Sequence, residues 1–373
     1  MLSEPYRKML LNSLATGKVF RRTVHCIHVG RRHELEELAT DNEVIATGGS
    51  SARLVAGDAG WGKTHLRYMH TDQSALQNVV TAHVHADELG FGGFADAFSL
   101  QIWQQCISSI ECGNCKGLSG IVDAIRRTNG GIRVNSESCS RFGPAVPVNG
   151  FDILLNFLHL ASEDDDMAVR QYAFSWLFGA TESYVEAVKI LGVLTLMEDA
   201  SWVDRLAQLA CVLRTFGYAG LLVQVENLDA WLMDGCLDER IRSLYKLLRL
   251  IDDCDRNAYP GLGFVFYIEN STARMIETES DFRSGYAPHT RGMHCDRLKI
   301  TALSALSSEE IRSVLKKVGH LCVLDSEISR VLRSSEVEKE VDWYLNRVSV
   351  ANGPPGPFVS YFVRNLMARA YHS

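Results

Sequence analysis

The segment GDAGWGKTH, residues 57 to 65, limits the fold of this chain more than any other stretch of its sequence. It has the spacing G-x-x-x-x-G-K-[ST], with a short apolar run before it and a helical pattern after it. Glycines allow a tight turn whose backbone N–H groups can bind phosphate oxygens. The helix that follows presents its positive amino end to the same anion. The sequence therefore predicts a strand, a phosphate-binding loop and a helix, in this order. The four motif positions are Gly57, Gly62, Lys63 and Thr64.

The residue types in this loop also predict its ligands. Lys63 would reach the β- and γ-phosphates of a nucleotide, and the Thr64 hydroxyl would bind Mg²⁺. We therefore predict ATP and Mg²⁺ as cofactors. Trp61 is unusual in such a loop, and it either packs against the protein or stacks near the nucleotide. The predicted nucleotide contacts of the loop are Gly57, Asp58, Ala59, Gly60, Trp61, Gly62, Lys63, Thr64 and His65.

Short apolar runs alternate with helical patterns along the chain, which is typical of a parallel α/β sheet. We predict an α/β fold of the P-loop NTPase class, with a long helical insertion at about 95–215 and a helical C-terminal part. Inside the insertion, residues 111–150 are rich in Gly, Ser and Asn, so we expect no regular structure there. The apolar runs cover residues 53–56, 79–84, 221–225, 264–268 and 298–303.

These patterns divide the chain into three predicted segments. They are an N-terminal helical segment at 1–46, a nucleotide-binding core at 47–303, and a helical C-terminal domain of lid or winged-helix type at 304–373. Ser307, with Glu310 three residues later, predicts a capping box at the start of a C-terminal helix. Gly-Pro-Pro-Gly-Pro at 353–357 is expected to interrupt the helices that follow.

The apolar run at 221–225 ends in Glu226 and Asn227. A P-loop needs a second acid for Mg²⁺ at the end of a neighbouring strand, and a base beside it polarises the attacking water. We predict that Glu226 holds the metal together with Thr64. Asn227 occupies the position of the base, where an amide can orient a water but cannot accept its proton. Asp229 is a candidate substitute, and the alternative for the whole stretch is a buried strand whose acids face solvent.

Two residues further along the chain are candidates for contact with the γ-phosphate. Asn270 follows the apolar run at 264–268, where AAA+ ATPases place a polar residue that senses the γ-phosphate. A strand end that caps a turn is the alternative there. Arg291 is a candidate arginine finger that would act on a neighbouring subunit. A solvent-exposed loop arginine is the simpler interpretation of Arg291.

Composition excludes several classes of protein. The chain has 373 residues and a formal net charge of −7, so no global positive field draws it to nucleic acid. No apolar run approaches the ~20 residues that a membrane helix needs, and we expect no membrane contact. Ten cysteines occur without the spacing of a disulfide framework. We therefore expect a cytoplasmic protein with reduced thiols.

Two smaller groups of residues resemble parts of metal sites. Cys112 and Cys115 form one C-x-x-C pair, but a structural zinc site needs four ligands, so free thiols are the simpler interpretation. His83, His85 and Asp87 alternate at the end of a predicted strand and would share one face of it. A partly buried polar strand end is favoured over a metal cluster at this position.

Five blocks of the sequence resemble, in order, the ATP-binding proteins of BREX-type bacterial phage-defence loci, over residues 8 to 370. The resemblance implies a P-loop ATPase of the AAA+ or STAND type. Family members usually carry Asp-Glu in place of Glu226-Asn227, and an arginine after proline where this chain has Pro355-Gly356-Pro357; both departures predict slow hydrolysis. The blocks are VGRRHELEEL (29–38), GGSSARLVAGDAGWGKTHL (48–66), FGYAGLLVQVENLD (216–229), RSLYKLLRLIDD (242–253) and GLGFVFYIEN (261–270).

The resemblance also carries expectations about the base of the nucleotide and about partners. In related ATPases the Gly-Arg box lies near the adenine, so Gly30 and Arg31 are implied base-side contacts. A loop before a helix with a solvated arginine is the alternative. Other subunits of a defence complex are implied as partners, with a homo-oligomer as a further expectation. We predict a nucleotide-dependent switch or motor subunit, with two alternatives: a slow or inactive nucleotide-binding scaffold, and a DNA-associated ATPase that the net charge does not support.

Overall fold

The computed structural model forms two compact units. The first unit contains residues 1–36, 56–70 and 302–373, and the second contains residues 37–55 and 71–301. Each unit joins segments that are far apart in the sequence, whereas the predicted boundaries at 46 and 303 divide the chain linearly and stay a prediction. The structure describes residues 4–19, 21, 24–88, 100–129, 167–178, 201–233, 235–278, 298–325, 328–347 and 354–372.

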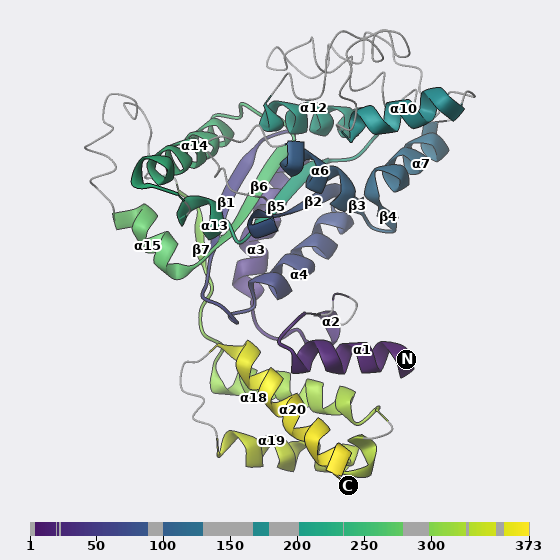
Figure 1. The fold of residues 1–373 in the computed structure, drawn as a ribbon, viewed down its shortest axis with the longest axis vertical. Coiled ribbons are helices and arrows are strands. Elements are labelled where there is room, and N and C mark those ends of the chain that lie inside the picture. The colour runs from purple at the N-terminus through teal and green to yellow at the C-terminus, as the bar shows by residue number, and fades with distance from the viewer. Residues whose placement is uncertain are drawn as a thin grey trace. The chain divides into compact units, whose positions relative to one another are not determined.

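The second unit is built on a seven-stranded sheet with the strand order β4-β3-β2-β5-β6-β1-β7 (Figure 1). β2, β5 and β6 are parallel to one another, and β3 pairs antiparallel with β2. Every residue of β5 and β6 is buried, as expected for central strands that are covered on both faces. The strands are β1 Ser51–Ala56, β2 Val79–His85, β3 Glu111–Cys112, β4 Cys115–Lys116, β5 Gly220–Glu226, β6 Leu262–Ile268 and β7 Ile300–Ala302.

The strand that leads into the glycine-rich loop runs in the same direction as β6. The Gly261 N–H donates to the Gly49 carbonyl at 2.8 Å, and a Cβ built on Gly263 would lie 3.4 Å from the Ser51 carbonyl oxygen. Gly261 thus lies beside Gly49, and Gly263 beside Ser51, which means that β1 and β6 are parallel. The carboxyl ends of β1, β6 and β5 therefore lie at the same edge of the sheet. This arrangement confirms the predicted parallel α/β fold.

Helices pack on the sheet, with α6 against β2 and α12 against β5 and β6. The expectation of no regular structure from residue 111 is wrong for 111–129, which form the β3–β4 hairpin and α7. Leu118, Ile121 and Val122 explain the difference, because their helical spacing gives α7 an apolar face that is buried. The remaining part, 130–150, lies outside the described residues. The helices are α3 Arg32–Ala46, α4 Lys63–Leu76, α6 Leu100–Ser109, α7 Gly117–Asn129, α10 Met167–Leu177, α12 Trp202–Thr215, α13 Asp229–Met233, α14 Leu237–Asp255 and α15 Asn270–Thr278.

Two glycines at the starts of β5 and β6 let α3 approach the sheet closely. A Cβ on Gly220 would lie 2.6 Å from Cγ2 of Ile45, and a Cβ on Gly263 would lie 2.2 Å from Cδ1 of the same side chain. Ile45 is completely buried between them. Any larger residue at either position would displace α3 or force Ile45 out of its rotamer.

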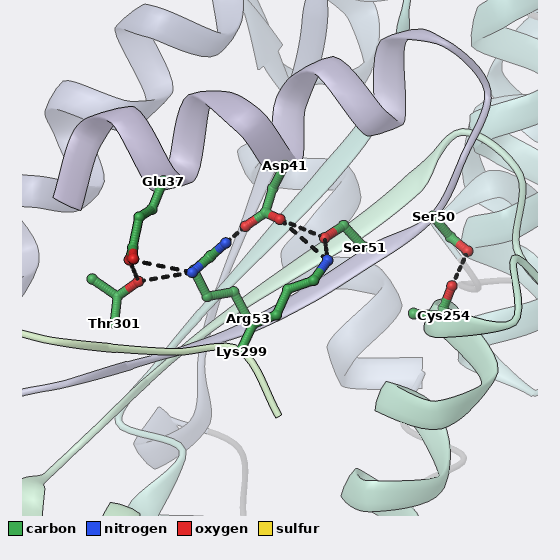
Figure 2. A network of polar contacts seen from close by, with 8 residues as sticks. All are labelled: Glu37, Asp41, Ser50, Ser51, Arg53, Cys254, Lys299 and Thr301. Atoms are coloured by element: carbon green, nitrogen blue, oxygen red, sulfur yellow. Dashed lines mark hydrogen bonds and ion pairs between the residues drawn. The ribbon is translucent and has the colours of Figure 1, made fainter. Parts of the chain in front are cut away.

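A buried polar network fixes α3 to β1 and to the segment around β7 (Figure 2). The Asp41 carboxylate accepts hydrogen bonds from the Arg53 guanidinium and, at 2.7 Å, from the Ser51 hydroxyl. Lys299 adds its ammonium, with Nζ 2.9 Å from Ser51 Oγ and 3.4 Å from the carboxylate. Arg53 also donates to Thr301 Oγ1 at 3.1 Å. Asp41 is only 3% exposed, and the Glu37 carboxylate, 3.2 Å from Arg53, adds a second negative charge to the network.

The first unit is a helical assembly with its own apolar core. The amino-terminal helix α1 packs against α18 and α20 of the C-terminal segment (Figure 1). The predicted capping box is confirmed, because the Ser307 hydroxyl accepts the Glu310 N–H and the Glu310 carboxylate accepts the Ser307 N–H. The expected interruption at 353–357 is wrong for its last three residues: proline suits the first position of a helix, and α20 begins at Pro355. The helices are α1 Glu4–Ala15, α2 Val24–Ile27, α18 Ser308–Cys322, α19 Val337–Leu345 and α20 Pro355–His372.

Within the described part of the chain, none of the helices has the length and apolar character that crossing a membrane requires.

Candidate functional site

The glycine-rich loop connects β1 to α4 as its sequence predicts. β1 ends at Ala56 and α4 begins at Lys63. Gly60 and Gly62 have φ angles of +81° and +92°, in the left-handed region that glycine occupies without a steric penalty. Asp58, Ala59 and Gly60 are exposed residues. The loop thus has the form of a phosphate cradle at the amino end of a helix.

Lys63, the charged member of the motif, lies over the loop. Its ammonium donates to the carbonyl of Gly57, so its side chain already points back across the turn. Thr64 and His65 follow in the first turn of α4 and are half-buried. Gly57 itself is buried, and a Cβ there would lie 3.1 Å from Leu303, so the first glycine is also needed for packing.

Arg31 lies next to the loop and binds its backbone. The guanidinium donates to the Trp61 carbonyl at 3.0 Å and forms an ion pair with Glu34 at 2.8 Å. Arg31 is 8% exposed, which is inconsistent with a solvated loop arginine. Gly30 and Arg31 both have positive φ angles, +71° and +61°, and this strained turn aims the side chain at the loop. Contact of these two residues with an adenine stays a prediction.

Two histidines stack beneath the loop. The rings of His28 and His65 have centroids 5.3 Å apart and are nearly parallel, with Nδ1 of His28 3.1 Å from Nε2 of His65. Burial, and next the neighbouring His28, lower the pKa of His65 to about 3. Burial and the Lys317 ammonium lower the pKa of His28 as well. Both rings are therefore neutral at physiological pH.

The start of α20 touches the glycine-rich loop directly. The Gly356 N–H donates to the Gly60 carbonyl at 3.0 Å. The packing is tight, because a Cβ on Gly356 would lie 3.1 Å from the Gly60 carbonyl oxygen, and a Cβ on Gly60 would lie 3.0 Å from Pro357. The sequence signals this contact only through the Gly-Pro-rich composition of 353–357, which predicts an unusual helix start but not its partner.

Glu226 is the last residue of β5 and faces histidines of the neighbouring strand. It is 5% exposed, and its Oε2 lies 3.0 Å from Nε2 of His83 and 3.7 Å from Nδ1 of His85. The parallel register explains this, because His85 is paired with Glu226 across the two strands. Asp87 is exposed in the next turn and is not part of the group. The two histidines are partly buried at the strand end, as the favoured interpretation predicts, and the acid beside them is Glu226.

The residues after Glu226 are arranged to terminate the strand. Asn227 is exposed and has a φ angle of +56°, which asparagine tolerates better than most residues. The Asp229 carboxylate accepts the Glu269 N–H at 3.0 and 3.1 Å, immediately before α15 begins at Asn270. Asp229 therefore joins the ends of β5 and β6. Its role as a substitute base and the γ-phosphate contact of Asn270 both stay predictions.

Two other candidates from the sequence have different outcomes. Arg291 lies outside the described residues, so its role as an arginine finger stays a prediction.

Cys112 and Cys115 lie opposite each other on the two strands of the β3–β4 hairpin. Burial, and next the neighbouring Cys115, raise the pKa of the Cys112 thiol to about 11, so this thiol is protonated at neutral pH. Both cysteines are free thiols in this structure, as the simpler interpretation predicts.

Two features define an AAA+-like P-loop NTPase fold. The first is the glycine-rich loop after β1. The second is the sheet order, in which β6 lies between β1 and the strand β5 that ends in Glu226. The chain belongs to the family described as BREX system ATP-binding protein BrxC/D, whose model matches residues 2–93 and 145–373. It is therefore an ATP-binding P-loop protein of a phage-defence system. A search of curated proteins found no significant match to the chain.

Solved structures with some similarity include origin recognition proteins. "Structure of Drosophila ORC bound to DNA" is 12% identical, with a TM-score of 0.46, and the alignment covers 96% of this chain and 64% of that chain. "Structure of the Aeropyrum Pernix ORC2 protein (ADPNP-ADP complexes)" is 14% identical, with a TM-score of 0.38, covering 91% and 68%. This chain thus spans less than two thirds of the length of the Drosophila protein.

Proposed function

We propose that this protein is a nucleotide-dependent switch subunit of a multi-protein phage-defence assembly. The observation that supports the proposal is the bond between Gly356, at the start of α20, and Gly60, in the middle of the phosphate-binding loop. Loop and helix belong to the same compact unit, so a change at one is felt by the other. A partner that binds the C-terminal helices would then read the nucleotide state.

ATP would act on this contact through the loop backbone. Bound phosphates would draw the Lys63 ammonium away from the Gly57 carbonyl and engage the N–H groups around Gly60. The Gly60 peptide is the one whose carbonyl accepts the α20 bond, so reorientation of this peptide strains or breaks that bond. The packing leaves little freedom, since Pro357 and Gly356 lie against Gly60 at van der Waals distance. The change in the loop backbone on ATP binding would therefore also move the start of α20.

Mg²⁺ would accompany the nucleotide, with Thr64 and Glu226 as its protein ligands. This assignment relies on the sequence alone: Thr64 is the hydroxyl residue of the P-loop motif, and Glu226 is the acid that ends the apolar run at 221–225. Carboxylate and hydroxyl oxygens suit Mg²⁺. Asn270 would contact the γ-phosphate, and Arg291 would act in a neighbouring subunit if the protein forms a homo-oligomer.

Slow hydrolysis is part of this proposal. Asn227 cannot accept a proton, and the Asp229 carboxylate already accepts the Glu269 N–H. Neither side chain is thus arranged as a free base for the attacking water. These contacts also favour the second candidate function, an inactive nucleotide-binding scaffold. A DNA-associated ATPase has less support, because the formal net charge of −7 provides no general attraction to DNA.

Phosphate release at saturating ATP–Mg²⁺ separates a motor from a switch or scaffold. The proteins to compare are the wild type, Lys63→Ala and Asn227→Glu. We expect the wild type to bind ATP and hydrolyse it slowly, and Asn227→Glu to hydrolyse it faster. Lys63→Ala should neither bind ATP nor hydrolyse it. Rapid turnover by the wild type that Asn227→Glu does not increase would contradict the assignment of Asn227 as the missing base. Absence of ATP binding by the wild type would refute the proposed function as a whole.

A further inference from the structure

The histidines that surround Glu226 are not explained by nucleotide binding. His83 and His85 lie on β2, and together with Glu226 each offers one ligand atom within 4.8 Å of the others. The two rings meet edge to face, with centroids 4.1 Å apart. One protonated imidazole would be enough to balance one carboxylate, and a second would add repulsion. Two neutral imidazoles and a carboxylate, in contrast, are the donor set of a transition-metal site.

We propose that His83, His85 and Glu226 form a binding site for a divalent transition-metal ion of the Zn²⁺ type. Zinc bonds of ~2.0–2.2 Å in a tetrahedron place neighbouring ligand atoms ~3.3 Å apart. The measured separations from Glu226 Oε2, 3.0 Å to His83 and 3.7 Å to His85, fall on either side of that value. The three ligand atoms lie within 4.8 Å of one another, so side-chain rotation would bring them to this spacing when a metal binds. Three protein ligands leave the fourth position to water or another ligand.

The backbone that carries the histidines is held rigidly. The two strands are in parallel register, with His85 opposite Glu226. The His83 N–H donates to Ser109 Oγ at 2.7 Å, the same hydroxyl donates to the His83 carbonyl at 2.8 Å, and the His85 N–H donates to Gln105 Oε1 at 2.8 Å. α6 thus fixes β2 on the side away from β5. Ligands on fixed strands lose little entropy when a metal binds.

Burial and donor type select the ion. The side chains of Glu226 and His83 are 6% and 16% exposed, whereas that of His85 is 37% exposed and gives access from solvent. Imidazole nitrogen is a good ligand for Zn²⁺, Co²⁺ and Ni²⁺ and a poor one for Mg²⁺. The donor set therefore selects a different ion from the Mg²⁺ of the proposed function, and the two ions would compete for Glu226. A metal bound by the histidines would hold this carboxylate away from nucleotide-bound Mg²⁺.

Co²⁺ binding by the full chain, without nucleotide, tests this inference separately from the proposed function. The protein is first stripped with a chelator and then titrated with Co²⁺, whose visible absorption becomes intense in four-coordinate sites; Zn²⁺ is then added in competition. We expect one equivalent of Co²⁺ to bind to the wild type and to be displaced by Zn²⁺. We expect His83→Gln and His85→Gln each to weaken binding at least tenfold, and the exposed matched control His320→Gln to leave it unchanged.

A second pair of substitutions excludes the cysteines as the source of the signal. In Cys112→Ser/Cys115→Ser the Co²⁺ spectrum should be the same as in wild type, without a thiolate charge-transfer band. His85 is the more exposed histidine, so His85→Gln should fold, which circular dichroism checks. The inference is overturned if the wild type gives no four-coordinate spectrum, if His85→Gln binds Co²⁺ as tightly as wild type, or if removing the two thiols abolishes binding.

Discussion

At the scale of single residues, two cations next to the phosphate-binding loop have different partners. The Lys63 ammonium donates to the Gly57 carbonyl, an acceptor that phosphate oxygens can replace. The Arg31 guanidinium is held by both the Trp61 carbonyl and Glu34, and it is almost fully buried. We therefore propose that Lys63 contacts the nucleotide and that Arg31 holds the loop in shape.

Substitution of Lys63 by alanine should weaken ATP binding about 10- to 100-fold, because a hydrogen bond to a charged group contributes ~1.5–3 kcal/mol. Isothermal titration calorimetry with ATP–Mg²⁺ measures the change. Lys316→Ala is the matched control, since this lysine of the same unit pairs with Glu338 at 2.6 Å, away from the loop. Equal affinities for wild type and Lys63→Ala would remove Lys63 from the nucleotide site.

His65 should make the folded state sensitive to acid. Its folded pKa of about 3 lies below the value of ~6.5 in an unfolded chain, so the stabilisation is present above pH ~6.5 and falls as the pH decreases. Between pH 7 and pH 5 the wild type should lose ~2 kcal/mol more of its unfolding free energy than His65→Gln. Urea unfolding at the two pH values measures this difference. His320→Gln should behave like wild type, and an equal loss in wild type and His65→Gln would show that His65 is not held neutral.

At the scale of elements, the position of α3 on the sheet depends on a few buried contacts. Ile45 fills the space left by Gly220 and Gly263, and Asp41 binds Arg53, Ser51 and Lys299 around β1. β1 leads directly into the phosphate-binding loop. These contacts therefore hold α3 at this corner of the sheet, beside the strand that precedes the loop.

Asp41→Ala should destabilise the protein by about 1.5–3 kcal/mol, because it removes the charged acceptor of the buried Arg53, which keeps only Glu37 as a carboxylate partner within the described part of the chain. Urea unfolding followed by far-ultraviolet circular dichroism measures the loss. Glu36→Ala on the same helix is the control: Glu36 and its partner Arg32 are exposed on the surface, and we expect no measurable change. If both variants unfolded at the wild-type urea concentration, the polar network would not be what fixes α3.

Sequence alone predicted those features whose signals are local. The loop at 57–64 has fixed spacing, and the central strands are continuous apolar runs, so both were recognisable. The Glu226–His83 contact depends on the register between two strands that are far apart in the sequence. The sequence pattern of one strand alone therefore could not reveal it. The Arg31 orientation depends on a left-handed backbone that most residues disfavour, which no periodicity reveals. α7 was missed because glycines at its start concealed its apolar face.

At the scale of the whole molecule, the amino- and carboxyl-terminal segments share one unit with the phosphate-binding loop. The linear sequence gives no sign of this, since the α1 and α20 helices that pack together are separated by most of the chain. The arrangement places the nucleotide loop and the C-terminal helices in one mechanical unit. It is the reason why we propose a switch read through α20.

Hydrogen–deuterium exchange of residues 355–372, with and without ATP–Mg²⁺, tests this central claim most directly. Because the Gly356 N–H bonds to the Gly60 carbonyl, ATP in the loop should change exchange at the start of α20 in the wild type. Lys63→Ala should show no change at the same ATP concentration. The account is contradicted if ATP binds to the wild type while exchange throughout 355–372 stays the same.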